Sequence, residues 1–344
     1  MSSTSGITLL GMGNPLLDIS ANVPDEVLTK YDVQTNNAIL AEEKHIPLYQ
    51  ELVDEYDVQF IAGGATQNSI RVAQWMLGTP GMTGYMGAIG MGDEFGQKLK
   101  TCATEDGVEV HYYEDETTPT GTCAVLVNGG DRSLVANLSA ANKFTDAHLA
   151  TPKAVEMVAS ARFYYIAGFF LTVSVDSIVK VATHAVEEGK VLAMNLSAPF
   201  LVQFFGDQMA TALPYCDYVF GNESEAEAFG EKHGWGKDLP TIALKLAAMP
   251  KSSGTRARTV VFTQGALSTI VATNGTVSEF PVDPLSADQL VDTNGAGDAF
   301  VGGFLAQLIK GEPLDKCVQA GHWASRVIIQ RSGCTFPEEC NYSS

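Results

Sequence analysis

The feature that constrains this chain most is the alternation of short apolar runs with amphipathic helical patterns. Ile7–Met12, Arg162–Ala167 and Thr259–Thr263 are mostly apolar rather than alternating, which is typical of strands covered on both faces. Between such runs, Thr66–Leu77 and Ser174–Glu188 each place apolar side chains on one helical stripe. The alternation predicts an α/β fold in which a mostly parallel sheet carries helices on both faces.

Two segments interrupt this alternation and predict a second, smaller domain. Residues 17–62 and 117–141 have the pattern of strands and turns, with a helical pattern only at His45–Tyr56. Such pieces do not fit easily into a parallel sheet, so we expect a small β-rich lid domain over its edge. The large α/β, nucleotide-binding domain would then comprise residues 1–16, 63–116 and 142–344.

Charge and composition narrow the classes of function. The net charge of −19 would repel nucleic acid and anionic membranes, so we expect neither as a partner. No apolar run approaches the ~20 residues that a membrane span needs. Met1–Gly6 lacks a signal-peptide pattern, and six scattered cysteines fit a reducing compartment. The expected protein is a monomer in the cytoplasm, with the nucleus as an alternative.

The strongest local signal is the segment Asp292–Phe300, which reads DTNGAGDAF. Gly295, Ala296 and Gly297 would direct backbone amides toward one point at the start of a helix. Such amides stabilise the charge on a transferring phosphoryl group, and Asp298 beside them would accept the proton of an attacking hydroxyl. The alternative is a helix-capping segment in which Asp298 only interacts with the helix dipole.

Polar residues also follow several predicted strands, at the edge where parallel sheets bind ligands. Asn14, Asn195, Asn222 and Gln264-Gly265 occupy these positions, although each alone could be an ordinary turn residue. Glu225 would share a helix face with Asn222 and is a candidate ligand for Mg²⁺ through water. The alternative for this pair is an N-x-x-E capping pattern.

A third group of residues suits a sugar. Asn14, Asp18 and Asn68 supply donors and acceptors for vicinal hydroxyls, and Gly64 allows close approach of the backbone. The alternative is a pair of turns without a ligand. The groups together indicate a site that holds a sugar beside a phosphoryl donor.

Three of these segments, in this order, resemble the ribokinase-like (PfkB) family of sugar and nucleoside kinases. They are Gly63-Gly64 with Asn68, the pair Asn222 and Glu225, and the loop Asp292–Asp298. The resemblance covers nearly the whole chain, and the loop is highly specific when the other two segments accompany it. It implies a Rossmann-like α/β domain with a β-rich lid.

Within the family, the chain most resembles members that phosphorylate a purine nucleoside. This closer resemblance rests on the segments Gly11–Asp18, Gln67–Ile70, Ala73–Trp75, Pro119–Thr122, Ile166–Val173, Asn195–Phe200 and Gly333–Pro337. The resemblance implies transfer of the ATP γ-phosphoryl to the 5′-hydroxyl of adenosine, with Mg²⁺ as cofactor. It also implies a monovalent cation such as K⁺. The alternatives are another purine nucleoside or a sugar as acceptor, or a regulator that binds nucleosides without catalysis.

The resemblance also implies individual roles. Asp298 would be the base, Gly295, Ala296 and Gly297 the anion hole, and Arg132 a lid residue that reaches the phosphates. The substrate-binding residues would be Asn14, Leu16, Asp18, Leu40, Gly63, Gly64, Asn68, Leu134, Ala136, Leu138, Phe169 and Asn294. The ATP side would comprise Asn195, Asn222, Glu225, Thr263, Gly265 and His322, with Glu225 as the metal residue and Asp292, Ser332 and Gly333 near the monovalent cation. A solvated charge at Arg132 and a core histidine at His322 are the structural alternatives. One departure is Ala65, where relatives often carry serine, so no polar contact is expected there.

Overall fold

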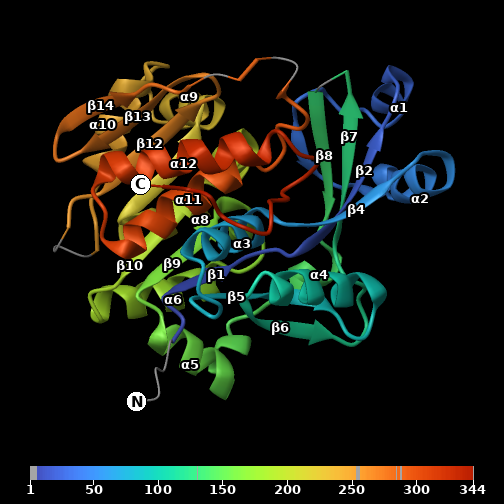
Figure 1. Ribbon diagram of the computed structural model, residues 1–344, viewed down its shortest axis with the longest axis horizontal. Helices are drawn as coiled ribbons and strands as arrows, with labels where there is room; N and C mark the ends of the chain where they lie inside the picture. The colour runs from blue at the N-terminus through green and yellow to red at the C-terminus, as the bar shows by residue number, and fades with distance from the viewer. Residues whose placement is uncertain (1–5, 130, 253–255, 284, 287–288, 344) are drawn as a thin grey trace.

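The chain folds around two sheets, seen in the computed structural model in Figure 1. The structure describes residues 6–129, 131–252, 256–283, 285–286 and 289–343. Of the segment Met1–Gly6, it therefore covers only Gly6. In the described residues the larger sheet has nine strands. Their order is β14 (Thr276–Phe280), β13 (Leu267–Thr273), β12 (Thr259–Gln264), β11 (Tyr218–Asn222), β10 (Val191–Asn195), β9 (Phe163–Ala167), β1 (Leu9–Met12), β5 (Thr83–Gly90) and β6 (Glu109–Asp115).

The larger sheet is parallel from β6 to β12, and only β13 and β14 at one edge are antiparallel. Its inner strands, such as β1 and β5, are buried on both faces because successive side chains enter opposite cores. Leu9 packs in one core with Phe304, whereas Leu10 packs in the other with Ile178. This double burial explains why the strands are mostly apolar rather than alternating in sequence.

Helices cover both faces of the larger sheet. One core draws on α3 (Ala65–Leu77), α4 (Glu94–Glu105), α11 (Ala296–Lys310) and α12 (Leu314–Ile328). The other draws on α5 (Pro152–Ser160), α6 (Val175–Glu187), α7 (Pro199–Phe204), α8 (Gly206–Ala212), α9 (Glu223–Lys232) and α10 (Leu239–Ala247). Short 3₁₀ segments are η1 (Glu43–His45), η2 (Ser139–Lys143), η3 (His148–Ala150), η4 (Gly168–Thr172) and η5 (Leu213–Tyr215). The expected α/β architecture is therefore confirmed.

The second sheet stands at the right of Figure 1, beside the larger one. Its order is β3 (Ala38–Leu40), β8 (Asp131–Asn137), β7 (Thr122–Asn128), β2 (Leu16–Asn22) and β4 (Gln59–Gly63). It packs against α2 (Ile46–Glu55) and the short α1 (Asp25–Lys30) through a core of its own, which includes Leu48 and Val27. The β-rich lid is confirmed as an architecture, whereas the division at residues 17–62 and 117–141 stays a prediction. The described helices include none long and apolar enough to cross a bilayer.

Candidate active site

A cavity of about 310 Å³ lies between the larger sheet and the lid. The chain runs from β1 to β5 and β6 on one side and continues through β9 and β10 on the other, which makes β1 and β9 the switch point of the sheet. Asn14 follows β1 and Phe169 follows β9, and both line the cavity. The fold therefore places the cavity where open α/β sheets bind their ligands.

The glycine loop forms the start of α11. Gly295 is the residue before the first helical turn, with a φ of 77°, and a Cβ there would lie 3.1 Å from Cys334 Cβ. Within the described residues, the amides of Gly295, Gly297 and Asp298 have no hydrogen-bond acceptor. The amide of Ala296 differs from the expectation, because it donates to the Thr293 carbonyl at 3.2 Å. The unoccupied amides at this helix start form a site suited to an anion.

Asp298 lies in the first turn of α11, beside those amides, and lines the cavity. Asn68 Nδ2 donates to Asp298 Oδ2 at 3.0 Å. Burial raises the pKa of Asp298 to about 7, and the bond from Asn68 opposes part of that rise. A carboxylate whose pKa lies near neutrality is well suited to accept a proton from a hydroxyl group.

Acceptor oxygens without donors face the same cavity. Asp18 is 8% exposed, and no described residue donates a hydrogen bond to its carboxylate. Its pKa is raised to about 8, first by burial and then by the charges of Asp298 and Asp292. Asn14 Oδ1 and Asn68 Oδ1 are buried and have no hydrogen-bond partner within the described residues. Because unpaired buried acceptors are costly, this set calls for a ligand that brings several hydroxyl donors.

The two glycines before α3 make room for this arrangement. A Cβ at Gly63 would fall 2.4 Å from Asp18 Oδ1, so only glycine leaves space for the carboxylate. Gly64 has a φ of 96°, and a Cβ there would lie 2.2 Å from the Asn14 carbonyl oxygen. Gly63 therefore acts behind Asp18, whereas Gly64 lines the cavity itself.

One wall of the cavity is apolar and comes largely from the lid. The expected residues Leu16, Leu40, Leu134, Ala136, Leu138 and Phe169 all line it. Further lining residues that were not predicted are Ala38, Ile39, Cys123, Phe170, Thr172, Ser197 and Phe200. Phe170, Thr172, Ser197 and Phe200 lie in two segments already noted for their resemblance, Ile166–Val173 and Asn195–Phe200. Ala38, Ile39 and Cys123 join the cavity only through the tertiary fold. The wall suits a flat, apolar group such as a purine ring.

Asn222 and Glu225 form a complete capping box at the start of α9. The Glu225 amide donates to Asn222 Oδ1 at 2.9 Å, and the Asn222 amide donates to Glu225 Oε2 at 3.0 Å. The capping alternative is thus realised, yet both residues also line the cavity. No described residue bonds to Glu225 Oε1, which leaves one carboxylate oxygen for a water-bound Mg²⁺. Burial raises the pKa of Glu225 to about 7.

Arg132 joins the lid to the anion loop. Its Nε lies 2.9 Å from Asp292 Oδ1, and its Nη2 donates to the Val291 carbonyl at 2.9 Å. The Arg132 side chain is 11% exposed and that of Asp292 is 3% exposed, so this ion pair is buried. Arg132 is therefore tied to the glycine loop rather than free in solvent.

Asp292 also organises the loop and its surroundings. Its Oδ1 accepts from the Asn294 amide at 2.8 Å, and its Oδ2 accepts from the Gly333 amide at 2.9 Å. Ser332 Oγ donates to Gln59 Oε1. Both Asp292 oxygens thus accept hydrogen bonds, so Asp292 links the lid, the glycine loop and the Gly333 turn. The expected monovalent cation near Asp292, Ser332 and Gly333 stays a prediction. Asn294 lines the cavity, as expected for a substrate-side residue.

Three residues expected on the ATP side lie outside this cavity. Thr263 Oγ1 lies 3.5 Å from the Gly221 carbonyl oxygen, and Gly265 lies in the exposed turn between β12 and β13. His322 Nε2 lies 2.8 Å from Thr269 Oγ1, and burial lowers the pKa of its ring. This environment matches the structural alternative for His322, while Asn195 does line the cavity.

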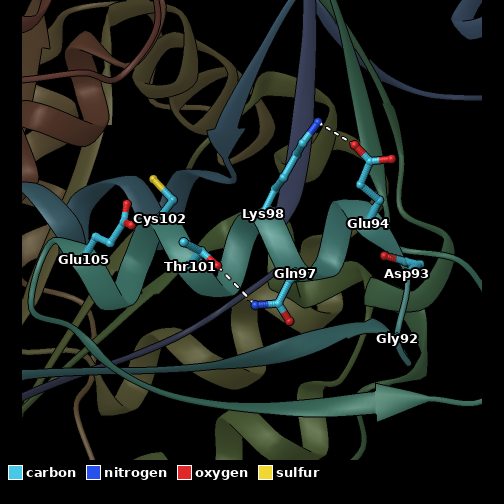
Figure 2. A pocket seen from close by; sticks show the side chains of 8 residues that line it. All are labelled: Gly92, Asp93, Glu94, Gln97, Lys98, Thr101, Cys102 and Glu105. Atoms are coloured by element: carbon cyan, nitrogen blue, oxygen red, sulfur yellow. Dashed lines mark hydrogen bonds and ion pairs between the residues drawn. The ribbon is translucent and has the colours of Figure 1, made fainter.

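A second hollow lies on the surface along α4 and is shown in Figure 2. Most of its polar side chains bond to one another or to nearby residues, although Glu105 has no partner among the described residues. Lys98 pairs with Glu94 at 3.0 Å, Gln97 donates to Thr101 at 3.1 Å, and Asp93 accepts from the Gly96 amide at 2.6 Å. This self-paired surface contrasts with the unpaired acceptors of the cavity at Asp298.

Comparison with known proteins agrees with this geometry. The model of the pfkB family of carbohydrate kinases matches residues 26–340. The chain belongs to the pfkB family of carbohydrate kinases. Adenosine kinase 2 of Arabidopsis thaliana is 59% identical over 336 residues, with 97% of each chain covered. The adenosine kinase of Dictyostelium discoideum is 48% identical over 333 residues, again with 97% of each chain covered.

Solved structures of adenosine kinases are similar to this chain over nearly its whole length. The Anopheles gambiae adenosine kinase in complex with P1,P4-di(adenosine-5) tetraphosphate has a TM-score of 0.95 and 51% identity, covering 97% of this chain and 99% of its own. The Schistosoma mansoni adenosine kinase in complex with adenosine and AMP has a TM-score of 0.90 and 37% identity, covering 96% of this chain and 97% of its own. The ribokinase-like arrangement expected from the sequence is confirmed.

The raised pKa of Asp298 predicts a pH-dependent gain in stability when the carboxylate is removed. Because the folded state holds the proton more tightly than the unfolded state, Asp298 contributes stability at low pH, and this is lost as pH rises through about 7. We expect Asp298→Asn to melt about 1–3 °C above wild type at about pH 8.5 and to lose most of that gain at about pH 5. Thermal unfolding at both pH values measures this, and an equal difference at both would contradict it.

Proposed function

We propose that this chain is an adenosine kinase, which transfers the γ-phosphoryl group of ATP to the 5′-hydroxyl of adenosine. The products are AMP and ADP, as in purine salvage. The proposal rests on one observation: a single cavity has hydrogen-bond acceptors in one half and backbone amide donors in the other. Among the described residues, Asp18 and Asn14 offer acceptors that receive no donor, and Asp298 lies beside amides that have no acceptor. The relatives named above, which are adenosine kinases, support the same acceptor.

Adenosine fits the cavity in one orientation. Its base would lie against the apolar wall of Leu16, Leu134 and Phe169. Its ribose hydroxyls would donate to Asp18 and its neighbours, which removes the cost of the unpaired acceptors. The 5′-hydroxyl then points toward Asp298, at the far end of the same cavity.

Asp298 would take the proton of the 5′-hydroxyl as that oxygen attacks the γ-phosphorus and the bond to the ADP oxygen breaks. The amides of Gly295 and Gly297 would hold the oxygens of the transferring group. Arg132 would add positive charge by exchanging its bond with Asp292 for one with phosphate. Closure of the lid over the cavity excludes water, which would otherwise compete as acceptor.

Magnesium would be held near Glu225, whose Oε1 is not engaged by any described residue, with most of its ligands from water and phosphate. When bound, it neutralises phosphate charge in a chain with a net charge of −19. The monovalent cation near Asp292 stays a prediction, and no step here is routed through it. We propose that the enzyme acts as a monomer in the cytoplasm.

The acceptor is tested by ADP release with adenosine, inosine and ribose under identical conditions. We expect transfer to adenosine to be the fastest, because the apolar wall stabilises a base that ribose lacks. Preference for inosine or ribose would assign a different acceptor to the same site. Tight adenosine binding without ADP release from any of the three would favour a regulator.

A further inference from the structure

Ser197 has a backbone conformation that is unusual for a residue with a side chain. It lies between β10 and α7, with a φ of 68° in the left-handed region. That region is costly for residues other than glycine, and such strain persists where surrounding contacts hold it, often at functional sites. Ser197 also lines the cavity at Asp298, although the sequence marked only its segment, Asn195–Phe200, and gave Ser197 itself no role.

The hydrogen bonds of Ser197 join two turns of the larger sheet. Ser197 Oγ accepts from the Gly168 amide at 2.8 Å and donates to the Asn195 carbonyl at 3.3 Å. The Ser197 amide donates to Asn195 Oδ1 at 2.9 Å. One side chain therefore ties the turn after β9 to the end of β10.

The Gly168 side of this link belongs to the nucleoside half of the cavity. A Cβ at Gly168 would lie 2.6 Å from the Asn195 carbonyl oxygen, so the two backbones are in close contact. Gly168 begins η4, whose next residue, Phe169, lines the cavity. Asn14 Nδ2 donates to the Phe169 carbonyl at 3.4 Å. A shift of Gly168 would therefore move both the apolar wall and a sugar-side amide.

The Asn195 side belongs to the phosphate half. Asn195 lines the cavity together with Asn222 and Glu225. Ser197 itself lines this half of the cavity with them. The Ser197 turn thus lies close to the carboxylate expected to act near the metal.

We propose that Ser197 is a positioning residue that holds the nucleoside wall at Phe169 and the phosphate-side Asn195 in fixed register. It acts through these neighbours rather than on the reacting atoms. The inference rests on the function proposed above, since the two halves of the cavity are those of the acceptor and the donor. The hydroxyl is the essential group, because it accepts from one turn and donates to the other.

The test compares Ser197→Ala, which keeps the backbone strain, with Ser197→Gly, which relieves it. Both remove the hydroxyl, so we expect both to raise the KM for adenosine and to lower kcat, each by about tenfold. Ser160→Ala is the matched control, because Ser160 Oγ donates only to Met157 in its own helix. Melting temperatures of all variants check the fold, and the glycine variant guards against misfolding of the alanine variant.

Three outcomes would overturn the inference. Unchanged KM and kcat in both variants would remove Ser197 from positioning. A defect in the alanine variant alone would assign the effect to backbone strain. A lower melting temperature with normal kinetics would leave only a structural role. Calorimetric binding of adenosine to each variant keeps the test separate from the proposed function, because it compares affinities even if the wild type transferred no phosphate.

Discussion

Asp298→Asn is expected to lower kcat by about 10²–10⁴-fold, the range typical for loss of a general base. The affinity for adenosine should change little, because an asparagine keeps the size of the side chain and can still accept from Asn68 Nδ2, now bonded at 3.0 Å. The change thus removes proton acceptance while keeping most ground-state contacts. Steady-state kinetics together with calorimetric binding of adenosine measure the two effects separately.

A matched control separates catalysis from helix capping. Asp315 is exposed in the first turn of α12, where it also interacts with a helix dipole. Asp315→Asn should therefore leave kcat near the wild-type value. If Asp298→Asn behaved like Asp315→Asn, Asp298 would be only a capping residue and the catalytic role would be wrong.

The second large effect is expected at Asp18. Asp18→Ala should raise the KM for adenosine by about 10²–10³-fold, because two hydrogen bonds from the ribose to a carboxylate are each worth about 1.5–3 kcal/mol. The effect on kcat at saturating adenosine should be smaller, since Asp298 and the anion loop stay intact. Initial rates across adenosine concentrations and calorimetric titration give both quantities.

The control for Asp18 is another lid carboxylate. Asp54 lies on α2, where it accepts from Gln50 at 2.8 Å at the surface. Asp54→Ala should therefore leave the KM for adenosine unchanged. An unchanged KM in Asp18→Ala would remove Asp18 from the sugar site and leave its unpaired carboxylate without an explanation.

Local sequence patterns predicted the parts of the fold that are continuous in the chain. The strand at Thr259–Thr263 and the helix at Thr66–Leu77 lie within one residue of the observed elements, because apolar periodicity reflects burial directly. The helix Asp25–Lys30 and the strand Glu109–Asp115 were not predicted. The first is short, and the second is an edge strand whose polar residues hide its period.

The residues of the site could likewise be predicted only where they lie close together in the chain. The glycine loop and Asp298 could be predicted because helix start, amides and carboxylate lie in one segment. Ser197 and Thr172 lie in segments that carry the resemblance, but their place in the cavity could not be predicted, because they join it only where distant strand ends meet. The Arg132–Asp292 ion pair joins residues 160 positions apart, so no local pattern indicates it. The ATP contact of His322 rests on the resemblance alone and stays a prediction, while the structure shows its Nε2 at 2.8 Å from Thr269 Oγ1.

The most direct test of the account is a crystal structure with adenosine and a non-hydrolysable ATP analogue bound together. The account predicts the adenosine 5′-oxygen within about 2.6–3.2 Å of an Asp298 carboxylate oxygen. It also predicts terminal phosphate oxygens about 2.7–3.1 Å from the Gly295 and Gly297 amides. A 5′-oxygen directed away from Asp298, or a terminal phosphate bound elsewhere than the start of α11, would contradict it.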